Sequence, residues 1–96
     1  MWRLVNIRRI ILDVDKSMNR PTLVELSEAI SRVQGVEAVN ISVTEMDVAT
    51  MGMNITVEGQ GIDYDELVSR IEETGAALHS VDEIAVGKRL IENIRR

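Results

Sequence analysis

Hydrophobic and polar positions along the first third of the chain predict a strand followed by a helix. Residues 7–14 are rich in β-branched side chains, as strands are. Thr22 and Glu25 have the spacing of a capping box, in which each side chain accepts a hydrogen bond from the other residue's backbone N–H. Apolar residues then recur at helical spacing over 22–34, and Gly35 follows as a helix stop.

The middle of the chain alternates strictly between apolar and polar residues. Apolar residues occupy every second position over 39–43 and again over 53–57, with polar residues between them. This period of two is typical of a half-buried strand. Residues 47–52 separate the two segments, so we expect a β-hairpin with one polar face.

The last third of the chain predicts a second helix, a fourth strand and a short tail. Asp63 and Glu66 again have the capping spacing, and an apolar helical stripe follows as far as Gly75. Residues 77–85 predict the fourth strand. After Gly87, the apolar spacing indicates a short C-terminal helix. Its stripe consists of Leu90, Ile91 and Ile94.

This order of elements, βαββαβ, indicates an α+β ferredoxin-like sandwich. In that fold a four-stranded antiparallel sheet with the strand order 4-1-3-2 carries both helices on one face. The similar hexapeptides ELSEAI (25–30) and ELVSRI (66–71) are consistent with two halves built from one unit. We therefore expect a single ferredoxin-like domain over 1–96, a length that suits one domain.

The two faces of the first strand follow from its alternation. The side that faces the helices would consist of Ile10, Leu12 and Val14. The open side would consist of Ile7, Arg9, Ile11, Asp13 and Asp15. With Val81 from the fourth strand, Ile7 and Ile11 would form an apolar strip on the open face, ringed by charges.

Opposite charges across neighbouring strands stabilise a sheet and favour one register. In that register the fourth strand pairs with the first as Asp13–His79, Ile11–Val81 and Arg9–Glu83. The third strand pairs with the first as Arg9–Glu58 and Asp13–Asn54.

This register gathers metal-ligating side chains at one end of the open face. The candidate metal ligands are Asp13, Asp15, Asn54 and His79. Hard cations such as Ca²⁺ and Mg²⁺ take oxygen ligands from carboxylates and amides, so we expect a site for one of them here. The alternative is a cross-strand Asp–His pair on a solvated sheet. Glu45 and Asp47 form a second acidic cluster, interpreted as a charged edge that discourages aggregation.

The composition excludes several classes of chemistry. The chain has no cysteine, which excludes disulfides, thiolate metal sites, iron–sulfur clusters and cysteine nucleophiles. Its single histidine excludes a His-rich metal site. Residues 59–61 (Gly-Gln-Gly) precede a helix, as phosphate loops do, but lack the P-loop lysine. Ser80 adjoins His79, yet neighbours on a strand point to opposite faces. We therefore expect no catalytic residues.

Charge is unevenly distributed along the chain, whose net charge is −5. Residues 1–9 and residues 88–96 each carry +3, whereas the intervening segment carries −11. An acidic body does not suit a nucleic-acid backbone, which needs a basic face. Basic ends suit contact with the acidic body of a second copy, and charges that only maintain solubility are the alternative.

The sequence has no features of a membrane or secreted protein. No apolar run approaches the ~20 residues of a membrane helix. The N-terminal arginines are not followed by the apolar stretch of a signal peptide. We expect a cytoplasmic protein that does not bind a membrane.

Four segments of the chain resemble one archaeal family. They are RIILDV (9–14), GVEAVNIS (35–42), VEGQGIDYDELVSRIEETG (57–75) and LHSVDEIAVGKRLIE (78–92). The family is domain-of-unknown-function family 211, and the run His-Ser-Val-Asp-Glu is the most specific part of the resemblance. It implies a ferredoxin-like fold, an archaeal cytoplasmic origin, hexameric rings and association with divalent cations, without established catalytic residues.

Individual residues agree with the family pattern to different degrees. Those that match are Asp13, His79, Asp82 and Glu83. Asp15 departs from it, since the resemblance implies an apolar residue there.

We expect a non-enzymatic oligomeric binding or regulatory module that partners with itself, as a ring of six, and takes a divalent cation or a small polar ligand. The alternative is a small enzyme of the acylphosphatase type, which has the same strand order. That chemistry uses a glycine-rich anion loop after the first strand, and DKSMNRP (15–21) has no glycine. RNA binding through the sheet would need stacking aromatics, which the sheet lacks.

Overall fold

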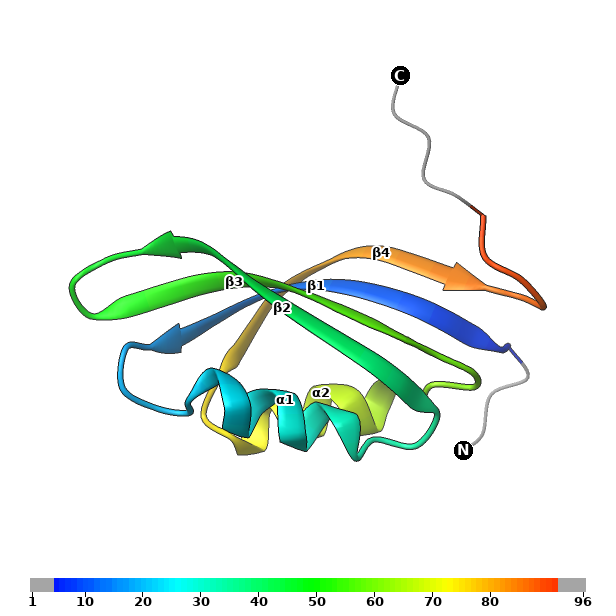
Figure 1. The fold of residues 1–96 in the computed structure, drawn as a ribbon, viewed down its shortest axis with the longest axis horizontal. Helices are drawn as coiled ribbons and strands as arrows, with labels where there is room; N and C mark the ends of the chain where they lie inside the picture. Colours follow the sequence, from blue (N-terminus) through cyan, green and yellow to red (C-terminus); the bar gives the residue numbers. More distant parts are fainter. Residues whose placement is uncertain (1–4, 92–96) are drawn as a thin grey trace, which may run out of the picture.

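The computed structural model describes residues 5–91, which form four strands and two helices in the expected order (Figure 1). The strands are longer than expected, because β1 and β2 each span 11 residues. The elements are β1 (Ile7–Ser17), α1 (Leu23–Ser31), β2 (Val36–Met46), β3 (Thr50–Gly59), α2 (Tyr64–Glu73) and β4 (Ala77–Val86).

The four strands form one antiparallel sheet in the order β2-β3-β1-β4, which is the expected order read from the other edge. Figure 1 shows both helices beneath one face of this sheet, so no helix or strand of residues 5–91 covers the other face, the open face. The α+β architecture is therefore confirmed. The expected C-terminal helix is not shown: residues 87–91 are not helical, and residues 92–96 lie outside the described range.

Both helices begin at the predicted caps. Thr22 Oγ1 accepts a hydrogen bond from Glu25 N, and Glu25 Oε1 accepts one from Thr22 N, each at 3.0 Å. At α2, Asp63 Oδ1 accepts a hydrogen bond from Glu66 N at 3.0 Å. Gly75 follows the end of α2 with a φ of 101°, a left-handed conformation that favours glycine.

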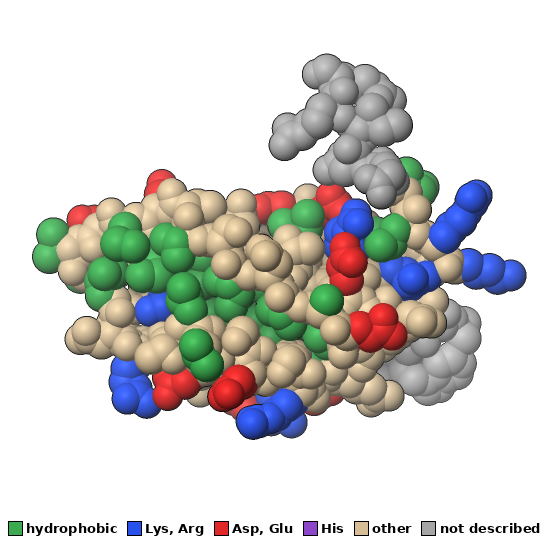
Figure 2. Space-filling view, in the orientation of Figure 1, with side chains coloured by type: hydrophobic (Ala, Val, Ile, Leu, Met, Phe, Trp, Pro, Cys, Tyr) green, Lys and Arg blue, Asp and Glu red, His purple; other side chains and the backbone are tan. Residues whose placement is uncertain are grey.

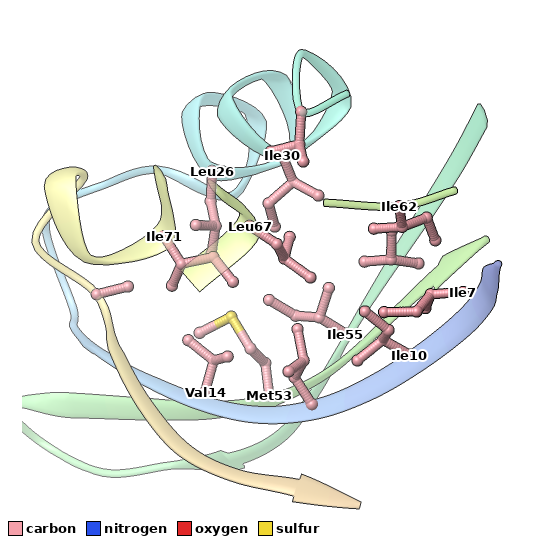
Figure 3. Packing of buried hydrophobic residues seen from close by; sticks show 14 residues of the cluster. Ile7, Ile10, Val14, Leu26, Ile30, Met53, Ile55, Ile62, Leu67 and Ile71 are labelled. Carbon is pink, nitrogen blue, oxygen red and sulfur yellow. The ribbon is translucent and has the colours of Figure 1, made fainter. Parts of the chain in front are cut away.

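The core lies between the helices and the covered face of the sheet (Figure 3). Ile10, Leu12 and Val14 of β1 are fully buried in it, as expected. The largest of the other fully buried side chains come from β3 and the two helices. They are Leu26, Ile30, Met53, Ile55, Val57, Leu67 and Ile71.

The prediction that Ile7 lies on the open face is wrong. Its side chain is only 3% exposed and belongs to the core, near Ile62 in Figure 3. The pairing of β1 with β4 shifts between Ile7 and Arg9, which leaves Arg8 as an extra residue. An extra residue reverses the alternation of side chains on either side of it, so Ile7 turns inward.

The predicted pairing of β1 with β4 is wrong by one to two residues. Asp13 lies opposite Ser80, and Ile11 lies opposite Glu83. The pairing shifts twice more, and His79 and Asp82 are the extra residues of β4 at these shifts. Charge matching assumes an unbroken ladder, and each bulge displaces every later pair by one residue.

The prediction that Val81 lies on the open face is therefore also wrong. It lies opposite Leu12, whose side chain is buried toward the helices. The apolar strip expected on the open face does not form, because two of its three residues have turned to the other side of the sheet.

Candidate binding site on the open sheet face

Arg9 joins three strands at one end of the open face. Its Nε donates to Glu58 Oε2 on β3 at 2.9 Å, and its Nη1 donates to Glu83 Oε2 on β4 at 3.3 Å. The hydrogen bond with Glu58 is the main cause that raises the pKa of the Arg9 guanidinium. Both contacts were predicted, although Glu83 reaches Arg9 diagonally because its direct neighbour on β1 is Ile11.

The predicted pairing of β1 with β3 is confirmed. Arg9 lies opposite Glu58 and Asp13 lies opposite Asn54 in an unbroken ladder from Arg9 to Ser17. Asp13 and Asp15 are alternate residues of β1, so both side chains lie on the open face. Sequence reasoning succeeded here because neither strand contains a bulge in this ladder.

His79 makes its contact with Asp15. His79 Nδ1 lies 3.9 Å from Asp15 Oδ2, and the two side chains are 65% and 54% exposed. A separation of 3.9 Å is an ion-pair distance for a protonated imidazole and is longer than a hydrogen bond. The expected register paired His79 with Asp13. The bulge at His79 explains why this pairing does not form.

Asp15 and Glu45 approach each other across Gly52. Gly52 on β3 lies between Asp15 on β1 and Glu45 on β2 in the sheet. The position that a Cβ atom of Gly52 would occupy lies 3.2 Å from Asp15 Oδ1 and 3.7 Å from Glu45 Oε1. The missing side chain thus leaves a space that two carboxylates face from opposite sides.

This space opens into a surface hollow of about 520 Å³ at the end of the β2–β3 hairpin. Its lining residues are Asp15, Glu45, Met46, Asp47, Thr50 and Gly52. In the sequence, Asp15 belongs to one predicted acidic cluster and Glu45 with Asp47 to another. The structure joins the two clusters. The available signal was Gly52, since a glycine inside a strand often marks a close approach.

The donor types of this hollow suit a hard cation, which prefers carboxylate oxygens. Within residues 5–91, no three His, Asp or Glu side chains already stand close enough together to hold a metal ion. The arrangement therefore offers an open pair of carboxylates with an imidazole beside it. Carboxylate rotation or water molecules would complete the coordination of a bound ion.

The Gly-Gln-Gly segment has a structural role in the described chain. Gly35 O accepts a hydrogen bond from Gln60 N at 2.9 Å, and Gln34 O accepts one from Asp63 N at 3.0 Å. A Cβ atom on Gly59 would lie 1.9 Å from Gly35 O. The glycine at this position therefore permits close packing of two backbone turns.

Among the described residues, neither helix is long and apolar enough to cross a bilayer.

A family model described as "Uncharacterized ArCR", domain-of-unknown-function family 211, matches residues 8–96. The chain is also 37% identical over 89 residues to "Uncharacterized protein MJ0319" of the archaeon Methanocaldococcus jannaschii. That match covers 93% of this chain and 91% of the relative. The chain belongs to the archaeal domain-of-unknown-function family 211, as its sequence segments had indicated.

Proposed function

We propose that the protein is a non-enzymatic, homo-oligomeric binding module that takes a divalent cation, Ca²⁺ or Mg²⁺, or a small polar ligand on its open sheet face. The observation that supports this proposal is the space at Gly52, which Asp15 Oδ1 and Glu45 Oε1 approach from two neighbouring strands. A cation placed between the two carboxylates would be attracted to both of them.

The other candidate ligands would contribute from the same side of the sheet. Asp13 and Asn54 lie one step further along the β1–β3 ladder, on the face that also carries Asp15. His79 Nδ1 lies 3.9 Å from Asp15 Oδ2, so the imidazole stands beside the proposed cation. Carboxylate-rich sites select Ca²⁺ when they are flexible, because Ca²⁺ accepts six to eight oxygens in variable geometry.

Calorimetric titration of the intact protein with calcium chloride and magnesium chloride tests the site. Gly52→Ala is the most informative variant, because it fills the space and removes no ligand. We expect the wild type to release or absorb heat with one cation, and we expect Gly52→Ala and Asp15→Asn to weaken that binding at least tenfold. Asp13→Ala and His79→Ala test the outer ligands, with smaller losses expected.

Glu28→Gln is the matched control, since Glu28 is an exposed acid of α1 on the helical side. It should bind as tightly as the wild type. Equal affinity of the wild type and Gly52→Ala would contradict the site at Gly52. No heat from any of the proteins would contradict cation binding itself.

Self-association into a closed ring, with six copies as the expected number, is the second part of the proposal. The chain exposes large apolar side chains that a monomer leaves in water, including Ile84 and Val86 on the edge strand β4. Light scattering on the full chain and on a chain that ends at Gly87 tests this part. A full chain that scatters as a monomer would contradict it. If the oligomer is unchanged after truncation, residues 88–96 do not make the contact.

A cytoplasmic location is a further part of the proposal. The charge of the open face supports a module that does not bind nucleic acid. Asp13, Asp15 and Glu45 lie on it, and the exposed Asp47 lies just beyond its hairpin end. A phosphate backbone would be repelled from this surface.

A further inference from the structure

We propose that the tip of the β2–β3 hairpin in one copy docks onto the far end of β4 in a second copy, so that the copies associate head to tail. This inference rests on the proposed self-association and names the two surfaces that make the contact. The "hairpin tip" comprises residues 43–49. The "β4 end" comprises Val5, Arg8, Ile84, Val86 and residues 88–91.

The first observation is where the exposed apolar side chains lie. Of the nine large hydrophobic residues exposed within residues 5–91, all but Val24 and Val81 fall in these two surfaces. The hairpin tip exposes Val43, Met46 and Val48, of which Val48 is 94% exposed. The β4 end exposes Val5, Ile84, Val86 and Ile91. Exposed hydrophobic residues that are scattered singly over a surface are normal, whereas residues concentrated in patches are typical of interaction surfaces.

The shape of the fold explains why the tip is uncovered. Helices of 9 and 10 residues cannot span strands of up to 11 residues, because a helix rises about 1.5 Å per residue and a strand about 3.3 Å. Figure 1 shows the β2–β3 hairpin extending beyond the end of α1. Figure 2 shows hydrophobic side chains gathered over this hairpin half of the molecule.

The second observation is that the two surfaces carry opposite charge. Glu45 and Asp47 are exposed at the hairpin tip, and Asp15 lines the same hollow. Lys88 and Arg89 are exposed at the β4 end. Arg8 lies beside them, since its guanidinium donates to the backbone oxygens of Gly59 and Lys88. Figure 2 shows Lys and Arg side chains projecting from the molecule at this end.

The third observation is that the two surfaces cannot meet within one chain. Ser17 at the end of β1 pairs with Thr50 beside the hairpin tip, whereas Ile7 at the start of β1 pairs with Val86 at the β4 end. The length of β1 therefore separates them by roughly 33 Å at about 3.3 Å per residue. Their complementarity is satisfied only between two copies.

This pairing disfavours one kind of assembly, in which a surface meets its own counterpart across a two-fold axis. Tip against tip would oppose acids, and β4 end against β4 end would oppose basic residues, so a two-fold contact through either surface is disfavoured. A tip-to-β4 contact uses two different surfaces of each copy. Contacts of this kind continue from copy to copy and close into a ring when the rotation permits.

A charge-swap experiment tests the contact. One variant combines Asp47→Lys with Val48→Lys, and the other combines Lys88→Glu with Arg89→Glu. The β4-end variant changes no residue that lines the hollow, so its calcium titration remains a separate readout of the cation site. The control combines Val24→Lys with Glu28→Lys, which makes on α1 the same change in charge as the tip variant and likewise replaces an exposed valine.

Light scattering should show that each tip or β4-end variant alone falls to the mass of one chain, 10.8 kDa. An equimolar mixture of the two should regain the wild-type mass, because each altered surface then meets a complementary one. The control should keep the wild-type mass. Circular dichroism checks that every variant is folded.

Three results would overturn the contact. Variants that each keep the wild-type mass would show that assembly uses another surface, while the proposed self-association would stand. Variants that dissociate and stay monomeric when mixed would show that the two surfaces do not pair. A monomeric wild type would refute self-association and this contact together.

Discussion

Gly59→Ala should destabilise the fold by preventing two backbone turns from touching. The β3–α2 turn packs against the α1–β2 turn at this point, and a Cβ atom on residue 59 would lie 1.9 Å from Gly35 O, 2.9 Å from Gly35 C and 3.0 Å from Glu37 N. All three atoms belong to the backbone, so no side-chain rotation relieves the overlap. The turns must separate.

The magnitude follows from two contributions. Overpacking that shifts the backbone costs about 1–3 kcal/mol. Separation of the turns also weakens the hydrogen bond from Gln60 N to Gly35 O, which is 2.9 Å long, and its loss costs about 1 kcal/mol. The free energy of unfolding should therefore fall by about 2–4 kcal/mol, which lowers the urea midpoint by roughly 2 M for a chain of this size.

Urea unfolding monitored by circular dichroism at one fixed protein concentration measures this change. Gly52→Ala is the matched control, because Gly52 is also a buried glycine of β3 with an ordinary φ. Its nearest neighbour is the flexible end of Asp15 at 3.2 Å, so we expect a loss below about 1 kcal/mol. The reasoning is refuted if Gly59→Ala unfolds within about 0.5 kcal/mol of the wild type, or if the control loses as much.

Three further changes test other parts of the fold. Leu12→Ala removes a fully buried side chain from the centre of β1 and should lower the free energy of unfolding by about 2–5 kcal/mol in the same urea assay. Thr22→Ala removes the cap of α1 and should cost about 1 kcal/mol; an unchanged midpoint would show that the cap contributes nothing. Glu25 reports on pH: the hydrogen bond from Thr22 N, followed by the charge of Arg20, lowers the pKa of the Glu25 carboxyl below its ordinary value of 4.5. A lowered pKa in the folded state gives stability that is present above the unfolded pKa and is lost as pH falls through the folded one. Glu25→Gln should therefore be less stable than the wild type near neutral pH and equal to it in strong acid, and a difference that persists in acid would contradict this assignment.

The sequence by itself determined the order of the strands and helices and the architecture. Period-two alternation and two capping sequences were enough to predict the βαββαβ order. Buried apolar residues recur at every second position in a strand and at every third or fourth position in a helix, so the spacing distinguishes the two. The β1–β3 pairing was also predictable, since Arg9–Glu58 and Asp13–Asn54 lie in a ladder without bulges. The family was identifiable from local segments such as the run that begins at His79.

Tertiary structure alone decided the open face and the ends of the molecule. The extra residues Arg8, His79 and Asp82 moved Ile7 into the core and brought His79 to Asp15, and no pattern of charges reveals where a bulge occurs. The space at Gly52 required three strands in register. The exposed hairpin tip depends on the difference between strand and helix lengths in space. Each of these features arises from contacts between segments far apart in the chain, and local sequence encodes such contacts only weakly.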